Sequence, residues 1–185
     1  MSESLLHRHE VSVPDIDSEA SIPAETFKAA FRNHALGVAV VTADPGGMPV
    51  AMTISSLSSV SADPPLLVFS ASQASSGTPV LERADTVVVH MLSAEQLALA
   101  KLGATSGIDR FADTSLWSRL PTGEPRFHDA PAWLRGRVVV RVALSGSILY
   151  IVHVIDASVD QDLPADPLAY HNRTWHRLGT HSALE

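Results

Sequence analysis

The chain of 185 residues has a formal net charge of −7, no cysteine, 45% hydrophobic and 18% charged residues. This composition is typical of one globular domain with a sizeable core. The acidic balance argues against a nucleic-acid surface, and the lack of cysteine excludes disulfides, thiolate metal sites and dithiol redox chemistry. No apolar run approaches the roughly 20 residues that span a bilayer, and the N-terminus lacks a signal-peptide core, so we expect no membrane partner and a cytoplasmic location.

The N-terminal segment predicts an arm followed by a helix. Residues 1–21 mix charge, Ser and Pro without a sustained period, which indicates a mobile arm. Pro23 can open a helix, in which Phe27 and Phe31 begin an apolar stripe that runs on to Leu36. We expect this helix to plug one end of a barrel.

A hairpin follows, with strands over 36–43 and 48–55. The second strand opens the most distinctive stretch of the chain, 50–67, where six side-chain hydroxyls lie within nine residues and a Pro-Pro pair ends the run. Because side chains alternate across a strand, Thr53 and Ser55 share one face and Met52 and Ile54 the other. The stretch is either a Ser-rich surface turn or a hydroxyl wall for a polar ligand or phosphate.

A second group of hydroxyls precedes a short helix. A strand over 66–70 leads to Ser76 and Thr78, and Pro79 can begin the helix. Hydroxyls at a helix N-terminus suit an anion, because the first N–H groups are unpaired there. The alternative is that Thr78 only caps the helix.

The segment 86–92 predicts a strand buried on both faces. Its His90 is interpreted as a core or interface histidine with its hydrogen bonds satisfied. Ser93 and Gln96 have capping-box spacing and open a helix to about Leu102.

The rest of the chain predicts a loop and two hairpins. Asp109-Arg110-Phe111 lies in the loop, where Arg110 either pairs with Asp109 or solvent, or offers a fixed charge beside a phosphate. Turn residues fill 116–126. Long strands are expected over 132–144 and 148–159, and short ones over 167–170 and 174–178.

Three rival chemistries lack their motifs. The nine histidines form no helical His-Glu-x-x-His pair, so no metal site is predicted. The Gly-x-Ser-x-Gly elbow of hydrolases is absent, as are the Rossmann and P-loop glycine patterns.

The order of hydroxyl strand, Asp63-Pro64-Pro65, apolar strand and Ser76-Gly77-Thr78 resembles the flavin reductase-like family. Asp109-Arg110-Phe111 and the closing PLAYHNRTWHRL, 167–178, extend the resemblance over about 27–178. It implies a mainly β fold with peripheral helices, an FMN-binding split β-barrel, as one domain over 22–180 with a tail over 181–185. In this family the loop over 116–126 tends to lie near the open face of the cofactor.

The resemblance implies an NAD(P)H-dependent flavin reductase that supplies reduced FMN or FAD to a partner monooxygenase. Hydride transfer between two cofactors needs no catalytic side chain. A homodimer with a shared flavin groove is expected, also because the apolar strands 37–41 and 86–90 exceed what one small barrel buries.

Carried over residue by residue, the resemblance predicts two sets of site residues. Cofactor binding is assigned to Met52, Thr53, Ser55, Ser56, Ser61, Asp63, Ser70, Ser76, Thr78, Arg110 and Phe111. The nicotinamide side is assigned to Ser147, Tyr170 and Arg173. Many family members carry Gly-Asp-His where this chain has Ser145-Gly146-Ser147. The alternative function is therefore an FMN-binding flavoprotein of the same fold that does not use NAD(P)H and serves another redox partner.

Overall fold

The computed structural model describes residues 20–160 and 166–184. Most of the expected N-terminal arm, 1–19, lies outside the described residues, as does Glu185 of the expected tail. Strands are β1 (Leu36–Gly37), β2 (Ala39–Ala43), β3 (Val50–Ile54), β4 (Ser58–Ala62), β5 (Pro65–Ser72), β6 (Thr86–Met91), β7 (Trp117–Arg119), β8 (Pro125–Phe127), β9 (Ala132–Leu144), β10 (Ser147–Val159), β11 (Leu168–His171) and β12 (Thr174–Arg177). Helices are α1 (Ala24–Arg32), α2 (Thr78–Leu81) and α3 (Leu97–Ala104), with 3-10 turns η2 (Ala94–Gln96) and η3 (Thr180–Ser182).

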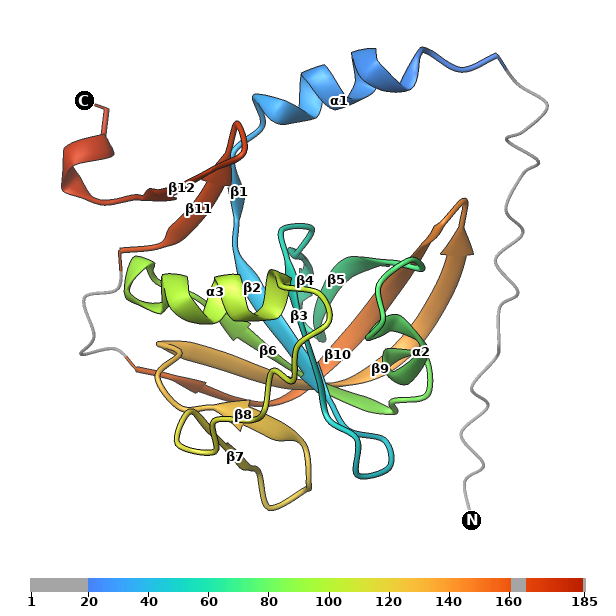
Figure 1. Cartoon of the computed structure of the whole chain (residues 1–185), viewed down its shortest axis with the longest axis vertical. Coiled ribbons are helices and arrows are strands. Elements are labelled where there is room, and N and C mark those ends of the chain that lie inside the picture. Colours follow the sequence, from blue (N-terminus) through green and yellow to red (C-terminus); the bar gives the residue numbers. More distant parts are fainter. Residues whose placement is uncertain (1–19, 161–165, 185) are drawn as a thin grey trace.

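A seven-stranded sheet in the order β3-β2-β6-β9-β10-β5-β4 forms the body of the molecule (Figure 1). All of its strand pairs are antiparallel, and the sheet curls without closing, which confirms the mainly β split barrel. A small sheet β1-β11-β12 stands at one end of the barrel, and the β7-β8 hairpin lies at the other.

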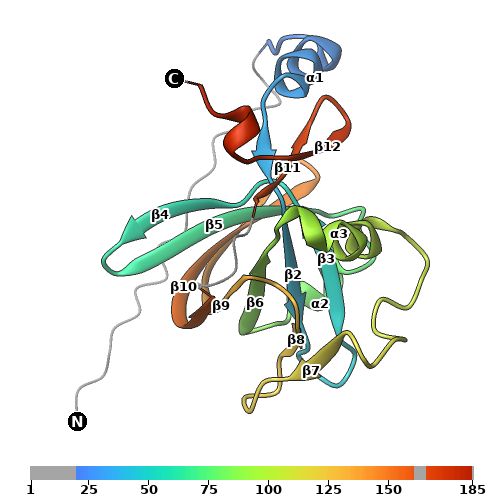
Figure 2. The same ribbon diagram turned by 90° about the vertical axis from the view of Figure 1, so that its left-hand side faces the viewer.

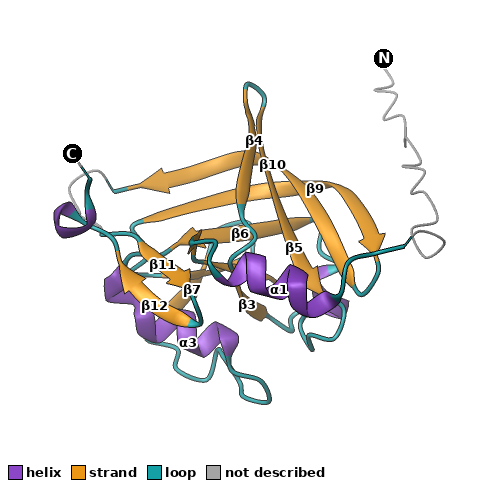
Figure 3. Cartoon of the chain, turned by 90° about the horizontal axis from the view of Figure 1, so that it is seen from above, coloured by secondary structure: helices purple, strands orange, loops and turns teal. Residues whose placement is uncertain are grey.

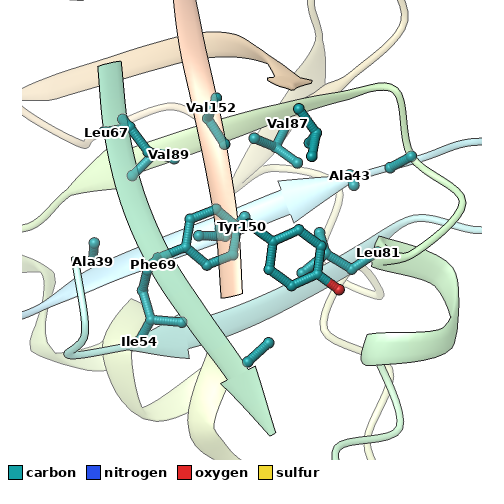
Figure 4. Close-up of a cluster of buried hydrophobic side chains, with 14 of the residues drawn as sticks. Ala39, Ala43, Ile54, Leu67, Phe69, Leu81, Val87, Val89, Tyr150 and Val152 are labelled. Atoms are coloured by element: carbon teal, nitrogen blue, oxygen red, sulfur yellow. The ribbon is translucent and has the colours of Figure 1, made fainter. Parts of the chain in front are cut away.

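The first core cluster fills the inside of this barrel. Phe69 on β5 stacks on Tyr150 on β10, with ring centroids 4.9 Å apart and planes inclined by 10° (Figure 4). Both rings are fully buried, among Val, Leu and Ala side chains from β2, β5, β6 and β10. Alternation along each strand explains this core, because every second residue points inward.

A second core cluster lies on the outer face of β2 and β6, beneath α3 and the β7-β8 hairpin. Val38 and Val40 pack there with Phe111 and Phe127. His90 sits at this layer fully buried, as predicted: its Nδ1 lies 3.0 Å from the Val40 carbonyl, and its Nε2 accepts the Phe127 N–H at 3.1 Å. Ser93 and Gln96 form the predicted capping box at the start of the helical segment.

Three expectations about the fold are wrong. Helix α1 has no buried residue and stands beside the β11-β12 hairpin, so it does not plug the barrel of its own chain (Figure 1). Residues 58–62, interpreted as loop, form β4, which pairs with β5 in an arm that projects from the body (Figure 2). The apolar strands β2 and β6 are covered on both faces within one chain, so they give no argument for a dimer.

Among residues 20–160 and 166–184, no helix is long and apolar enough to cross a membrane.

Candidate functional site

An open groove of about 610 Å³ runs between β3, β5 and the C-terminal end of α3. Its size falls within the roughly 300–1,000 Å³ of small-molecule sites. Its walls are rich in hydroxyl groups. It is lined by Met52, Thr53, Ile54, Ser55, Ser56, Ser70, Ala71, Ser72, Ala74, Ser75, Gly103, Ala104, Ser106, Arg110 and Ser147.

Of the predicted site residues, seven therefore come together, from segments that are almost a hundred residues apart: Met52, Thr53, Ser55, Ser56, Ser70, Arg110 and Ser147. Sequence reasoning did not assign Ser75, Gly103, Ala104 and Ser106 to the site. The only sequence feature that could have pointed to Ser106 as a site residue is its place before a glycine in a predicted loop.

Thr53 joins the groove to α3. Its hydroxyl donates to the Ala100 carbonyl oxygen at 2.7 Å. Gly103 makes this approach possible, because a Cβ at that position would lie 2.4 Å from Thr53 Oγ1 and 3.1 Å from its backbone nitrogen. With its proton committed to the helix, the Thr53 hydroxyl can only accept a hydrogen bond from a ligand.

Ser56, just after β3, and Ser70 on β5 are joined by two hydrogen bonds at the groove. The Ser56 hydroxyl donates to the Ser70 carbonyl oxygen at 3.0 Å and accepts the Ser70 N–H at 2.9 Å. One lone pair of Ser56 is left for a ligand.

The turn between β9 and β10 forms another edge of the groove. Ser145 and Gly146 have φ angles of 32° and 87°, and Ser147 begins β10. The Gly146 carbonyl accepts the Gln73 N–H at 2.9 Å, which ties the turn to the end of β5. Ser147 thus occupies a fixed place on the groove wall.

Arg110 supplies the positive charge of the groove. Its Nη2 donates to the Thr105 carbonyl oxygen at 2.6 Å, at the C-terminal end of α3. Its Nε is buried and has no hydrogen-bond partner among the described residues. A buried guanidinium N–H without a partner is costly, so the site fits an anionic acceptor such as the phosphate of FMN. Among the described residues no ion pair joins Asp109 to Arg110, and the Asp109 Oδ1 accepts the Phe111 N–H at 2.9 Å.

Five predicted cofactor residues, Phe111 among them, do not line the groove of their own chain. Ser61 and Asp63 lie on the projecting β4-β5 arm (Figure 2). Ser76 is exposed beside the groove. Thr78 is buried and does not cap the helix, because Gly77 stands at the N-cap and the Thr78 hydroxyl donates to the Ser72 carbonyl oxygen at 2.6 Å.

Phe111 points into the protein. It is 7% exposed, stacks on Phe127 at 5.5 Å and meets Trp117 edge-on at 5.0 Å. Its ring is therefore not free to cover a ligand in the groove. The loop over 116–126 folds as the β7-β8 hairpin, and no residue of that range lines the groove.

Tyr170 and Arg173 line a separate cavity of about 340 Å³ between α1 and the β11-β12 turn. Ser55 lines both this cavity and the groove, so the two hollows share a wall. The three residues predicted for the nicotinamide side therefore do not line one hollow. Ser147 lines the groove, whereas Tyr170 and Arg173 line the separate cavity.

The groove is built for binding. Its hydroxyls can accept and donate hydrogen bonds along a polar ring edge and chain, and Arg110 can hold an anion. Within the described part of the chain, no three His, Asp or Glu side chains are grouped in a way that holds a metal ion.

Residues 31–179 match the model of the flavin reductase like domain, and the chain belongs to this family. It is 38% identical over 175 residues to an NADH:FMN oxidoreductase of Rhodococcus qingshengii, covering 90% of this chain and 91% of that protein. It is 31% identical over 148 residues to the reductase component of 4-nitrophenol 4-monooxygenase/4-nitrocatechol 2-monooxygenase of Rhodococcus opacus, covering 78% and 77%. The crystal structure of a flavin reductase domain protein from Arthrobacter sp. FB24 superposes with a TM-score of 0.78 and 32% identity, covering 83% and 94%.

Proposed function

We propose that this protein is an NADH:FMN oxidoreductase that supplies reduced flavin to a partner monooxygenase. The observation that carries the proposal is the groove, in which a hydroxyl wall from β3 and β5 faces a guanidinium with an unpaired buried N–H. Relatives that match over most of their length are named as an NADH:FMN oxidoreductase and as a monooxygenase reductase component. A cytoplasmic location is part of the proposal, because the substrate NADH is intracellular.

The residues of the groove divide by chemistry. Arg110, with Ser75 and Ser106, which line the same groove, would hold the phosphate of FMN. Thr53, Ser55 and Ser70 would hydrogen-bond the ribityl chain and the polar edge of the ring. Bound FMN supplies a ring that accepts a hydride from the reduced nicotinamide. The protein orients the two cofactors and excludes competing reactions, so no acid, base or nucleophile is assigned.

The experiment is a steady-state assay of NADH and NADPH oxidation with FMN, FAD and riboflavin, paired with titration of the flavin-free protein by flavin fluorescence. We expect saturable FMN binding and rapid NADH oxidation. Saturable FMN binding with no oxidation of either nicotinamide would overturn the reductase function in favour of the flavoprotein that serves another redox partner. Absence of flavin binding would overturn both.

We also propose a homodimer, on a surface different from the one the sequence suggested. Six outward side chains of the β9-β10-β5 region are apolar and half-buried, and none of the six belongs to either core cluster. They are Leu66, Val68, Val140, Val142, Leu149 and Ile151. Strand register places Ile151 beside Val68 and Val140, and Leu149 beside Ser70 on the groove wall. A second copy on this face would bury the apolar patch next to the flavin site.

Sedimentation should give a dimer at micromolar concentration, and Ile151→Asp should give a monomer; a wild-type monomer would contradict the proposal.

A further inference from the structure

A further cavity, the α3 cavity, lies between helix α3 and the β7-β8 hairpin. Figure 2 and Figure 3 show α3 and this hairpin on the side of the molecule away from the tip of the β4-β5 arm. The volume of the cavity, about 330 Å³, falls within the roughly 300–1,000 Å³ of small-molecule sites. It shares no lining residue with the flavin groove. It is lined by Glu95, Gln96, Ala98, Leu99, Leu102, Leu116, Phe127 and Asp129.

The walls of the α3 cavity are apolar. Leu99 and Leu102, both half-buried and one turn apart on α3, form the helix wall. Leu116 and Phe127 form the hairpin wall, where the His128 N–H donates to the Leu116 carbonyl oxygen at 3.0 Å and holds the two segments together. Leu116 remains 40% exposed. A ligand with an apolar body would remove this surface from water, which favours binding.

The charged groups at the α3 cavity are two carboxylates. The Arg177 Nη2 donates to the Glu95 Oε1 at 2.7 Å, which balances the charge of Glu95. Asp129 is exposed and takes part in none of the ion pairs found within residues 20–160 and 166–184. The described lining residues include no lysine, arginine or histidine. The cavity therefore favours a cationic ligand over an anionic one.

Helix α3 connects the α3 cavity to the flavin groove. Ala100 follows Leu99 of the cavity wall, and its carbonyl oxygen accepts the Thr53 hydroxyl at 2.7 Å. Gly103 follows Leu102 and lines the groove, in close approach to Thr53. A shift of this helix would therefore change the cavity and the groove together.

The hairpin wall gives a second connection. Phe127 stacks on Phe111, with ring centroids 5.5 Å apart. Phe111 directly follows Arg110, the cation of the groove. Packed rings and a rigid helix are the kinds of contact through which two sites are coupled.

We propose that the α3 cavity binds a small arylalkylamine and that this ligand strengthens flavin binding in the groove. The aromatic ring lies against the leucines and Phe127, and the ammonium group lies at Asp129. A filled cavity keeps α3 against β3, so it stabilises the arrangement of Thr53 and Gly103 that forms the groove wall. The site itself is argued from its own contacts, whereas its effect on FMN rests on the proposed function.

Calorimetric titration of the flavin-free protein at pH 7.5 tests the site with three ligands that share one ring. They are 2-phenylethylamine, 2-phenylethanol and phenylacetate, which are a cation, a neutral molecule and an anion. The amine should bind saturably at about millimolar concentration or below. It should bind roughly two- to fivefold more tightly than the alcohol, because an exposed ion pair contributes modestly, and roughly tenfold more tightly than phenylacetate. Equal affinity for the three ligands, or no saturable binding of the amine, would overturn the inference.

Three variants test whether the amine binds in this cavity. Ala98→Phe, at an exposed position that lines the cavity, places a ring in its space and should weaken the amine and the alcohol alike by roughly tenfold. Asp129→Asn should weaken the amine by roughly two- to fivefold and leave the alcohol unchanged. Asp85→Asn removes an exposed carboxylate that does not line the cavity, and it should change neither. Wild-type affinity for the amine in both Ala98→Phe and Asp129→Asn would show that the amine binds elsewhere and would overturn the inference.

Titration with FMN, followed by flavin fluorescence with and without saturating 2-phenylethylamine, tests the effect on the groove. The amine should lower the Kd for FMN of wild type by roughly fivefold and leave that of Ala98→Phe unchanged. An unchanged Kd in wild type would overturn the coupling, and a raised Kd would place the amine in the groove and overturn the site. Absence of FMN binding without the amine would instead contradict the proposed function, and the calorimetric order of the three ligands would still decide the site.

Discussion

Acid should destabilise this fold between about pH 6.5 and pH 4, because His90 is neutral in the core. Its Nε2 accepts the Phe127 N–H, so its Nδ1 carries the proton and donates to the Val40 carbonyl oxygen. This arrangement ties β6 to β2 and β8. Protonation of Nε2 would remove the acceptor of the Phe127 N–H and place a charge in an apolar layer.

The size of the effect follows from the pKa. Burial lowers the pKa of His90 from 6.5 to about 4, against the hydrogen bond to Val40, and the charge of Arg126 lowers it further. In the unfolded chain the ring takes up its proton near pH 6.5, whereas in the folded chain it resists until about pH 4. The folded state is therefore favoured above pH 6.5, and this advantage is lost as the pH falls through that window. The separation corresponds to roughly 3 kcal/mol.

Urea unfolding, followed by tryptophan fluorescence at pH 7.5, 6.5, 5.5 and 4.5, measures this. The wild-type free energy of unfolding should fall by about 2–3 kcal/mol over the series. His90→Gln should be less stable at pH 7.5, because a buried ring and its contacts are lost, but it should lack this part of the pH dependence. His128→Gln, at an exposed position, should keep the wild-type dependence because it leaves His90 in place. Equal pH dependence in wild type and His90→Gln would refute the assignment. Protonation of Glu124 also removes stability, but at lower pH than protonation of His90. Burial raises the pKa of Glu124, but hydrogen bonds from Arg135, Thr122 and Thr86 outweigh this and bring the pKa to about 2.

Three further substitutions probe the groove. Gly103→Ala places a Cβ 2.4 Å from Thr53 Oγ1, so it should cost about 1–3 kcal/mol of stability and weaken FMN binding in a fluorescence titration, whereas Gly37→Ala, with open space around the Cβ, should change neither. Arg110→Ala should weaken FMN binding roughly tenfold or more and riboflavin binding little, since riboflavin has no phosphate; equal losses for both flavins would contradict the phosphate assignment. Ser147→His should lower KM for NADH by roughly three- to tenfold, in line with about 0.5–1.5 kcal/mol for one hydrogen bond, with FMN affinity unchanged; unchanged KM would show that the turn does not contact the nicotinamide.

The groove could be predicted where local pattern and family resemblance agree. Alternation along β3 separates Thr53 from Met52 and Ile54, and the structure keeps that separation, with Ile54 in the first core and Thr53 hydrogen-bonded to α3. Phe111 and Thr78 show the limit. Their residue types suit a flavin site, but Phe111 packs in the second core cluster and the Thr78 hydroxyl donates to the Ser72 carbonyl oxygen. Whether a side chain is free for a ligand depends on what its own fold requires of it.

The sequence by itself determined the strands of the main sheet other than β4, including the long β9-β10 hairpin, together with the capping box and the family. Strand alternation, turn residues and motif order are local features of the chain, so the sequence shows them directly. The tertiary structure decided how those elements meet. The close approach of Gly103 to Thr53 and the hydrogen bond from the Asn172 N–H to the Arg32 carbonyl oxygen join positions 50 and 140 residues apart, and no local pattern specifies a contact at that separation. The wrong prediction for helix α1 has the same cause, because its packing also depends on contacts between distant segments. The apolar stripe of α1 predicts that it packs against another surface, but only the three-dimensional arrangement shows that no described part of its own chain buries it.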